Sequence, residues 1–124
     1  MLDHVGIPVS DFARSRRFYE QALSPLGYGL IMEPRRGVAG LGRSGKPVFW
    51  VFQGEPGCAV HVAFTADDRA SVDAFHEAAI AAGGNDNGRP GLRPEYHPTY
   101  YGAFVLDPDG NNIEAVSHGP VEEA

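Results

Sequence analysis

The sequence predicts an α+β fold made of two repeated modules, each with the element order β-α-β-β-β. Three observations support this: the strand and helix patterns of the first module, their recurrence after the midpoint, and a final strand that follows the turn DPDG. A shift from position 4 to position 61 aligns the two modules without a gap through the end of the helix, with His4 on His61 and Gly27 on Gly84. We therefore expect a single domain with modules 1–54 and 58–118 and a short polar C-terminal tail.

The first module begins with LDHVGIPV, a short segment rich in branched residues that predicts a strand. Ser10 and Asp11 follow it and are suited to cap a helix. Apolar residues then recur at intervals of three and four from Phe12 to Leu26, which predicts an amphipathic helix that Pro25 and Gly27 end. Hairpin-type connections separate three further predicted strands, YGLIME, GVAGLG and PVFWVFQ.

The second module repeats this order with VHVAFT as a strand and a helix that ends before Gly84. A Gly/Pro-rich segment, GGNDNGRPGLRPEYHP, then takes the place of the compact hairpin, and we expect a long loop there that walls or covers a site. TYYGAFVL and NNIEAV are the last predicted strands, joined through DPDG, whose Asp, Pro and Gly positions suit a type I turn.

Composition restricts the partners. A net charge of -6 and a pI of about 5.2 argue against nucleic acid or an anionic membrane surface, which require clustered Lys and Arg. The sequence has no apolar run of membrane-spanning length and no signal-peptide pattern at its start, and its single cysteine, Cys58, cannot form an internal disulfide. We expect a cytoplasmic protein that acts on a small molecule, with Cys58 as a small buried apolar residue.

Strand parity places three potential metal ligands on the sheet face away from the helices. His4 alternates with Val5, and His61 alternates with Val62, so the large apolar side chains share the opposite face. Glu114 alternates in the same way in the last strand. Two histidines and one carboxylate at corresponding places form a plausible facial triad with open coordination positions, although a protein that has lost its metal would show the same residues.

These residues and the repeat closely resemble the vicinal oxygen chelate superfamily, which includes glyoxalases, bleomycin resistance proteins and extradiol dioxygenases. The resemblance extends from DHVGIPVSDFARSRRFYEQAL to DPDGNNIEAV. It implies a half-open barrel around one divalent metal ion (Fe, Mn, Zn or Ni) with His4, His61 and Glu114 as ligands. It also implies a homodimer with swapped modules, in which His4 of one chain completes the site formed by His61 and Glu114 of the other.

The resemblance implies several activities. Trp50 occupies the position of the fourth ligand of glyoxalase I, so the remaining three ligands are more similar to those of extradiol dioxygenases or fosfomycin thiol transferases. Our leading hypothesis is a metal-dependent dioxygenase, lyase or isomerase that chelates a substrate through two adjacent oxygens and stabilises an oxyanion or enolate. A drug-sequestering protein similar to bleomycin resistance proteins is the alternative. A thiol transferase is a further alternative, and it would need cations from Arg35, Arg36, Arg89 or Arg93 because none follows Glu114.

Further residues are candidates for contact with the substrate. We predict that catalysis involves Glu114, Tyr101 and His97, with a tyrosine or histidine donating a proton or a hydrogen bond. Parity puts Tyr101 with Ala103 and Tyr100 with Gly102, so one tyrosine should face the cavity. Trp50, Tyr100 and Arg93 are predicted to bind substrate. Core packing of the aromatic residues and a plain loop position for His97 are the competing interpretations.

Overall fold

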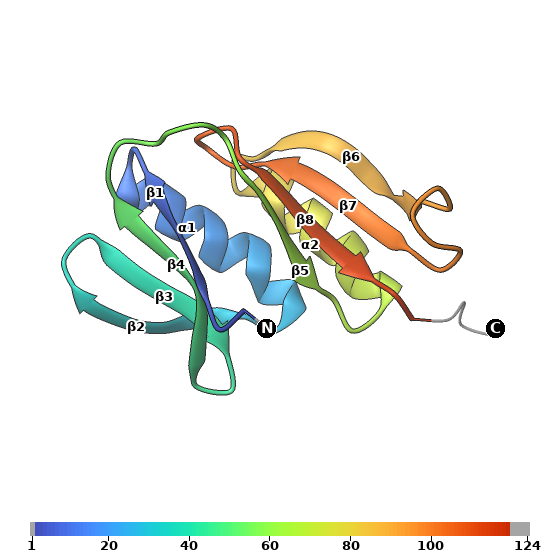
Figure 1. The fold of residues 1–124 in the computed structure, drawn as a ribbon, viewed down its shortest axis with the longest axis horizontal. Helices are drawn as coiled ribbons and strands as arrows, with labels where there is room; N and C mark the ends of the chain where they lie inside the picture. Colours follow the sequence, from blue (N-terminus) through green and yellow to red (C-terminus); the bar gives the residue numbers. More distant parts are fainter. Residues whose placement is uncertain (1, 120–124) are drawn as a thin grey trace.

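Two four-stranded sheets and two helices make up the protein in the computed structural model, which describes residues 2–119 (Figure 1). The polar C-terminal tail predicted from the sequence lies largely outside the described residues. The first module contains β1 (Val5–Val9), α1 (Phe12–Leu23), the 3-10 turn η1 (Ser24–Leu26), β2 (Gly29–Arg35), β3 (Val38–Arg43) and β4 (Lys46–Gln53). Its sheet has the order β1-β4-β3-β2, with β1 parallel to β4.

The second module has the same organisation. It contains β5 (His61–Thr65), α2 (Arg69–Ala81), β6 (Asn85–Leu92), β7 (Tyr101–Leu106) and β8 (Asn112–Ser117). Its sheet has the order β5-β8-β7-β6, with β5 parallel to β8. The predicted pair of βαβββ modules is thus confirmed, and the two sheets remain separate rather than closing into one barrel.

The Gly/Pro-rich segment after α2 is a strand for much of its length, so the prediction of a long loop there was wrong. Residues Asn85–Leu92 form β6, which pairs antiparallel with β7. The register shifts twice, between Asp86 and Gly88 and between Gly88 and Gly91. Because β6 is an edge strand, these irregularities and Pro90 interrupt pairing on one side only, which is where sheets tolerate them.

Equivalent aspartates begin the two helices. Asp11 accepts a hydrogen bond from the backbone N–H of Arg14 at 3.1 Å, which confirms the predicted cap. Asp68, at the corresponding place in the second module, accepts one from Ser71 at 2.8 Å, and this contact lowers the pKa of its carboxyl group. The sequence repeat therefore extends to the local signals that start each helix.

The core lies between the sheets and the helices, which pack against one another on one side of the molecule (Figure 1). Ile7, Val9, Phe49 and Val51 of the first sheet are buried there. The residues that alternate with them in β1 and β4 face away from the helices, so each sheet keeps one outer face for other partners. None of the described helices is long and apolar enough to cross a membrane.

One buried polar contact joins the modules. The hydroxyl of Tyr19 on α1 donates a hydrogen bond to Oδ2 of Asp107, which begins the DPDG turn between β7 and β8. Asp107 also accepts from the backbone N–H of Asp109 and from both the backbone and the side chain of Asn111. These four donors compensate for the burial of the carboxylate. Burial, followed by the charge of Asp107, raises the pKa of Tyr19 well above its usual value.

Cys58 departs from its predicted role. Its side chain is exposed in the segment that connects the two modules, so the prediction of a small buried residue was wrong. The connecting segment between β4 and β5 runs over the surface, where few side chains are covered.

Candidate metal centre

Glu114 is a buried carboxylate in the middle of β8, on the sheet face away from the helices. Its neighbours across the sheet are Ala63 on β5 and Phe104 on β7. The residue is only 1% exposed, and its Oε1 lies 3.0 Å from Nε2 of His61. Parity had predicted that His61 and Glu114 share a face, and the structure brings their side chains together.

His61 has the orientation of a metal ligand. Its Nδ1 lies 3.0 Å from the carbonyl oxygen of Asn112, and a carbonyl can only accept, so Nδ1 carries a proton. The other ring nitrogen, Nε2, faces the carboxylate of Glu114 and is the atom that would be available to a metal ion when it carries no proton. The imidazole also stacks against the Phe104 ring, with 6.1 Å between the centroids. A carbonyl partner on the far nitrogen is the usual way in which a ligating histidine is fixed.

Tyr100 holds the second oxygen of the carboxylate. Its hydroxyl donates a hydrogen bond to Oε2 of Glu114. Burial, and then this hydrogen bond, raise the pKa of Tyr100 well above its usual value, so the phenol stays protonated and acts as a donor. The contact depends on Gly102, because a Cβ there would lie 3.1 Å from Oε2 of Glu114 and 3.1 Å from the Tyr100 ring.

These groups border a cavity of about 510 Å³. Its lining comprises His61, Tyr96, Tyr100, Phe104, Asn112 and Glu114. Tyr96, Phe104 and Asn112 were not among the predicted site residues. Parity could have found the last two, because Phe104 alternates in step with Gly102 on β7 and Asn112 lies two residues before Glu114 on β8.

His4, the third predicted ligand, does not join this pair within the chain. Its Nδ1 lies 2.7 Å from Oδ1 of Asp3, and the same oxygen lies 2.8 Å from Nζ of Lys46. The Lys46 and His4 contacts lower the pKa of Asp3. His4 and His61 both line a cavity of about 410 Å³. Within residues 2–119, however, no three His, Cys, Asp or Glu side chains are close enough together to hold a metal ion.

The other predicted site residues lie apart from Glu114. Tyr101 faces α2, where its hydroxyl donates to Asp73 at 2.6 Å and its ring lies beneath Arg69. Of the two tyrosines, it is Tyr100 that contacts Glu114.

The loop residues and Trp50 also have other partners. Arg93 donates to the carbonyl of Arg89 at 2.7 Å and lies over the Phe104 ring. His97 is exposed, and its Nδ1 accepts from the backbone N–H of Thr99 at 3.2 Å. Trp50 lines a separate cavity on the first sheet.

The geometry of His61 and Glu114 fits a divalent metal ion. An imidazole nitrogen and a carboxylate oxygen are ligands that Zn, Fe, Mn and Ni accept. Nε2 of His61 and Oε1 of Glu114 lie 3.0 Å apart, and both residues line the same cavity. His61 and Glu114 would therefore supply two of the protein ligands, and Tyr100 would hold the carboxylate in place.

Comparisons with known proteins agree with this architecture. The glyoxalase/bleomycin resistance protein/dioxygenase superfamily profile matches residues 1–115. A glyoxalase/bleomycin resistance protein from Albidiferax ferrireducens T118 has 31% sequence identity and a TM-score of 0.81, covering 97% of this chain and 99% of the other. A glyoxalase I variant from Zea mays has 26% identity and a TM-score of 0.67, covering 93% of this chain and 46% of the maize chain.

Lactoylglutathione lyase from Agrobacterium tumefaciens, at 17% identity and a TM-score of 0.68, shares the fold over 94% of this chain and 92% of its own. The search of curated protein sequences gave no significant match. The profile covers nearly the whole chain, and its members include enzymes. The chain belongs to the glyoxalase/bleomycin resistance protein/dioxygenase superfamily.

Proposed function

We propose that this protein is a divalent-metal-dependent enzyme, a dioxygenase or a lyase or isomerase, whose small substrate binds through two adjacent oxygens. The observation that carries the proposal is the pairing of Glu114 with His61. A carboxylate that is 1% exposed, yet borders a cavity, is costly unless a cation or a proton compensates for it. A metal ion between Oε1 and Nε2 would provide that compensation.

The chain's own residues would have distinct roles. Glu114 and His61 would hold the metal through Oε1 and Nε2, and the carbonyl of Asn112 would orient the imidazole ring. Tyr100 keeps the carboxylate in one orientation and remains protonated. When bound, the metal would supply Lewis acidity that stabilises negative charge developing on a substrate oxygen.

The third ligand in this proposal is His4 of a second copy of the chain. Two features support a homodimer: His4 is exposed and does not form a three-ligand group with His61 and Glu114, and the first module presents exposed apolar side chains. These include Leu2 at 87%, Met32 at 43% and Phe52 at 38% exposure. Since an exposed free thiol such as Cys58 survives best in a reducing compartment, we also propose a cytoplasmic location.

Metal content of the protein purified without a metal-affinity tag tests the proposal. Wild type should contain roughly one divalent ion per chain, and Glu114→Ala and His61→Ala should each lose it. His76→Ala is the matched control, because His76 and Asp86 form another histidine–carboxylate pair, 2.9 Å apart, outside the cavity. If the metal stays in Glu114→Ala, or if added metal neither binds wild type nor changes its melting temperature, the proposal is wrong.

The thiol transferase has one observation in its favour. Arg35 and Arg36 line a cavity together with His4, and cations of this kind would hold a phosphonate. The same arginines argue against sequestration of a cationic drug at this cavity. Thiol-dependent loss of fosfomycin in the presence of metal would support the transferase.

A further inference from the structure

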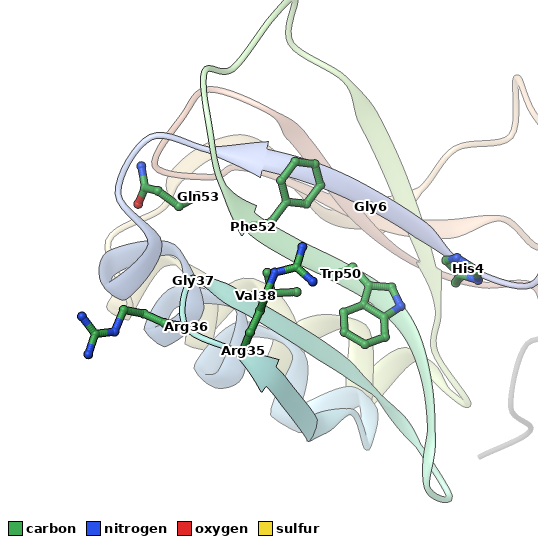
Figure 2. Close-up of a pocket in the computed structure, with 9 residues that line it drawn as sticks. All are labelled: His4, Gly6, Arg35, Arg36, Gly37, Val38, Trp50, Phe52 and Gln53. Atoms are coloured by element: carbon green, nitrogen blue, oxygen red, sulfur yellow. The ribbon is translucent and has the colours of Figure 1, made fainter.

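A cavity of about 570 Å³ lies on the outer face of the first sheet, with His4 at its border (Figure 2). Register places its main side chains in line across three strands. Arg35 on β2 pairs with Val38 on β3, and Val38 pairs with Phe52 on β4. Phe52 and Trp50 are two residues apart on β4, so both face away from the helices.

Glycines keep the surroundings of Trp50 open. Gly40 on β3 and Gly6 on β1 are its partners on either side. A Cβ at Gly40 would lie 2.9 Å from two carbons of the indole, so the absence of a side chain at Gly40 lets the Trp50 ring pack against the backbone there. Trp50 and the Phe52 ring, which is 38% exposed, together give the cavity flat apolar walls. Such walls suit a planar ligand.

The charge of this cavity is opposite to that of the whole protein. The chain has a net charge of -6, yet Arg35 and Arg36 line the cavity and no Asp or Glu does. Among the described residues, neither guanidinium lies within ion-pair distance of a carboxylate. Figure 2 shows the Arg35 side chain reaching between Phe52 and Trp50, while Arg36 points away from both rings.

We propose that this cavity binds a planar carboxylate, an aromatic or conjugated acid, with its carboxylate on Arg35 and its flat part on Trp50 and Phe52. A guanidinium matches a carboxylate with two parallel hydrogen bonds, and the aromatic walls contribute apolar contact. The assignment of this acid as the substrate rests on the proposed function, because His4 would then bring the cavity beside the shared metal centre. Binding of the acid itself does not depend on the metal.

The chain offers an internal reporter for the test. Trp50 is the only tryptophan, so its fluorescence follows the occupancy of this cavity. We would titrate the protein with benzoate and compare benzamide, a neutral analogue of the same shape, and methylphosphonate, an anion without a ring. Benzoate should change the fluorescence saturably and bind about tenfold more tightly than either comparison compound, the factor that one charge-assisted contact gives.

Two variants locate the contact. Arg35→Gln should weaken benzoate binding about tenfold while leaving the weak binding of benzamide unchanged. Arg36→Gln removes the same charge from the neighbouring residue and should change the affinity by less than about twofold, since its guanidinium points away from the Trp50 and Phe52 rings. Both residues are exposed, and equal melting temperatures would show that the variants are folded.

Each titration would be repeated after chelator treatment, which separates this inference from the proposed function. Benzoate binding that survives chelation and depends on Arg35 supports the planar-acid site even if the protein proves to hold no metal. Equal affinities for benzoate and benzamide, tighter binding of methylphosphonate, or no loss of affinity in Arg35→Gln would overturn the inference. Any of these results would overturn the planar-acid site whether or not Glu114→Ala loses a bound metal, because the two tests are independent.

Discussion

The Tyr100 hydroxyl donates a hydrogen bond to Oε2 of Glu114, while His61 contacts the other carboxylate oxygen, Oε1. The carboxylate is therefore held at one oxygen by a donor that stays protonated, and its other oxygen contacts His61. This division of the two oxygens explains how an acidic side chain persists in a strand whose neighbours, Ile113 and Ala115, are fully buried. In the proposed metal centre, the tyrosine would be a positioning residue.

We predict that Tyr100→Phe weakens metal binding about 10- to 100-fold, the usual effect of removing a group that orients a ligand. Loss of the hydroxyl also leaves a buried carboxylate oxygen without its donor, which should cost about 1–3 kcal/mol of unfolding free energy in the metal-free protein. Competition with a chelating dye would measure the first effect, and urea denaturation the second.

Tyr96→Phe is the control for this substitution. Tyr96 borders the same cavity, its ring lies 5.1 Å from that of Tyr100, and it is 64% exposed. Its hydroxyl has no hydrogen-bond partner among the described residues, so the change should leave both metal affinity and stability close to wild type. Equal behaviour of the two variants would show that the Tyr100 hydroxyl does not position Glu114.

Gly102→Ala should disturb the same contact by steric means. The added Cβ would lie 3.1 Å from both Oε2 of Glu114 and the Tyr100 ring, and the hydrogen bond between these groups prevents either from moving freely. We expect a loss of about 1–3 kcal/mol in stability together with weaker metal binding. Gly29→Ala is the control, because a Cβ at Gly29 would meet nothing within 4 Å, and a melting curve of each variant checks the difference.

A fourth prediction concerns the contact between the modules. Tyr19→Phe should lower the unfolding free energy by about 1–2 kcal/mol at neutral pH, because Asp107 loses one of its four donors. Tyr28→Phe is the control, since the Tyr28 hydroxyl has no hydrogen-bond partner among residues 2–119. Urea denaturation of the three proteins measures the difference, and metal content should not change.

The Tyr19 effect should depend on pH in a defined direction. Its pKa is raised in the folded state, so the stabilisation is complete below the unfolded value of 10.0 and is lost as pH rises above it toward the folded value. Stability of wild type should therefore fall more steeply above about pH 10 than that of Tyr19→Phe. A stability difference that stays constant or grows at alkaline pH would contradict the hydrogen bond in which the phenol is the donor.

Most of the fold could be predicted because its signals are local and occur twice. The alternation in β1 and β5, the helical periodicity and the paired caps Asp11 and Asp68 are each visible in a few residues. The strand β6 was missed because Gly88, Pro90 and Gly91 conceal any alternation, and pairing with β7 is a non-local interaction. Edge strands with bulges are hard to recognise in a sequence, because their residues do not keep a regular apolar–polar alternation.

The site was predictable to the extent that it follows from strand parity. Parity put His61 and Glu114 on one face, and the structure shows them 3.0 Å apart. It could not choose between Tyr100 and Tyr101, because either face of β7 would accept a tyrosine. The partner that holds Tyr101 away from the site is Asp73 on α2, and that contact arises only from tertiary packing. The position of His4 likewise depends on how the modules are arranged, which spacing along the chain does not encode.

Mixing two inactive variants would test whether the site is shared between chains. If His4 of one chain completes the site of its partner, a dimer of one His4→Ala chain and one Glu114→Ala chain contains one site with both defects and one intact site. Unfolding and refolding an equal mixture should produce about half mixed dimers and so restore about a quarter of the wild-type metal sites. A site formed within one chain would leave every chain with a defect, and the mixture would recover nothing. Metal content of the dimer fraction after removal of loosely bound ions distinguishes these outcomes, and each variant refolded alone gives the baseline.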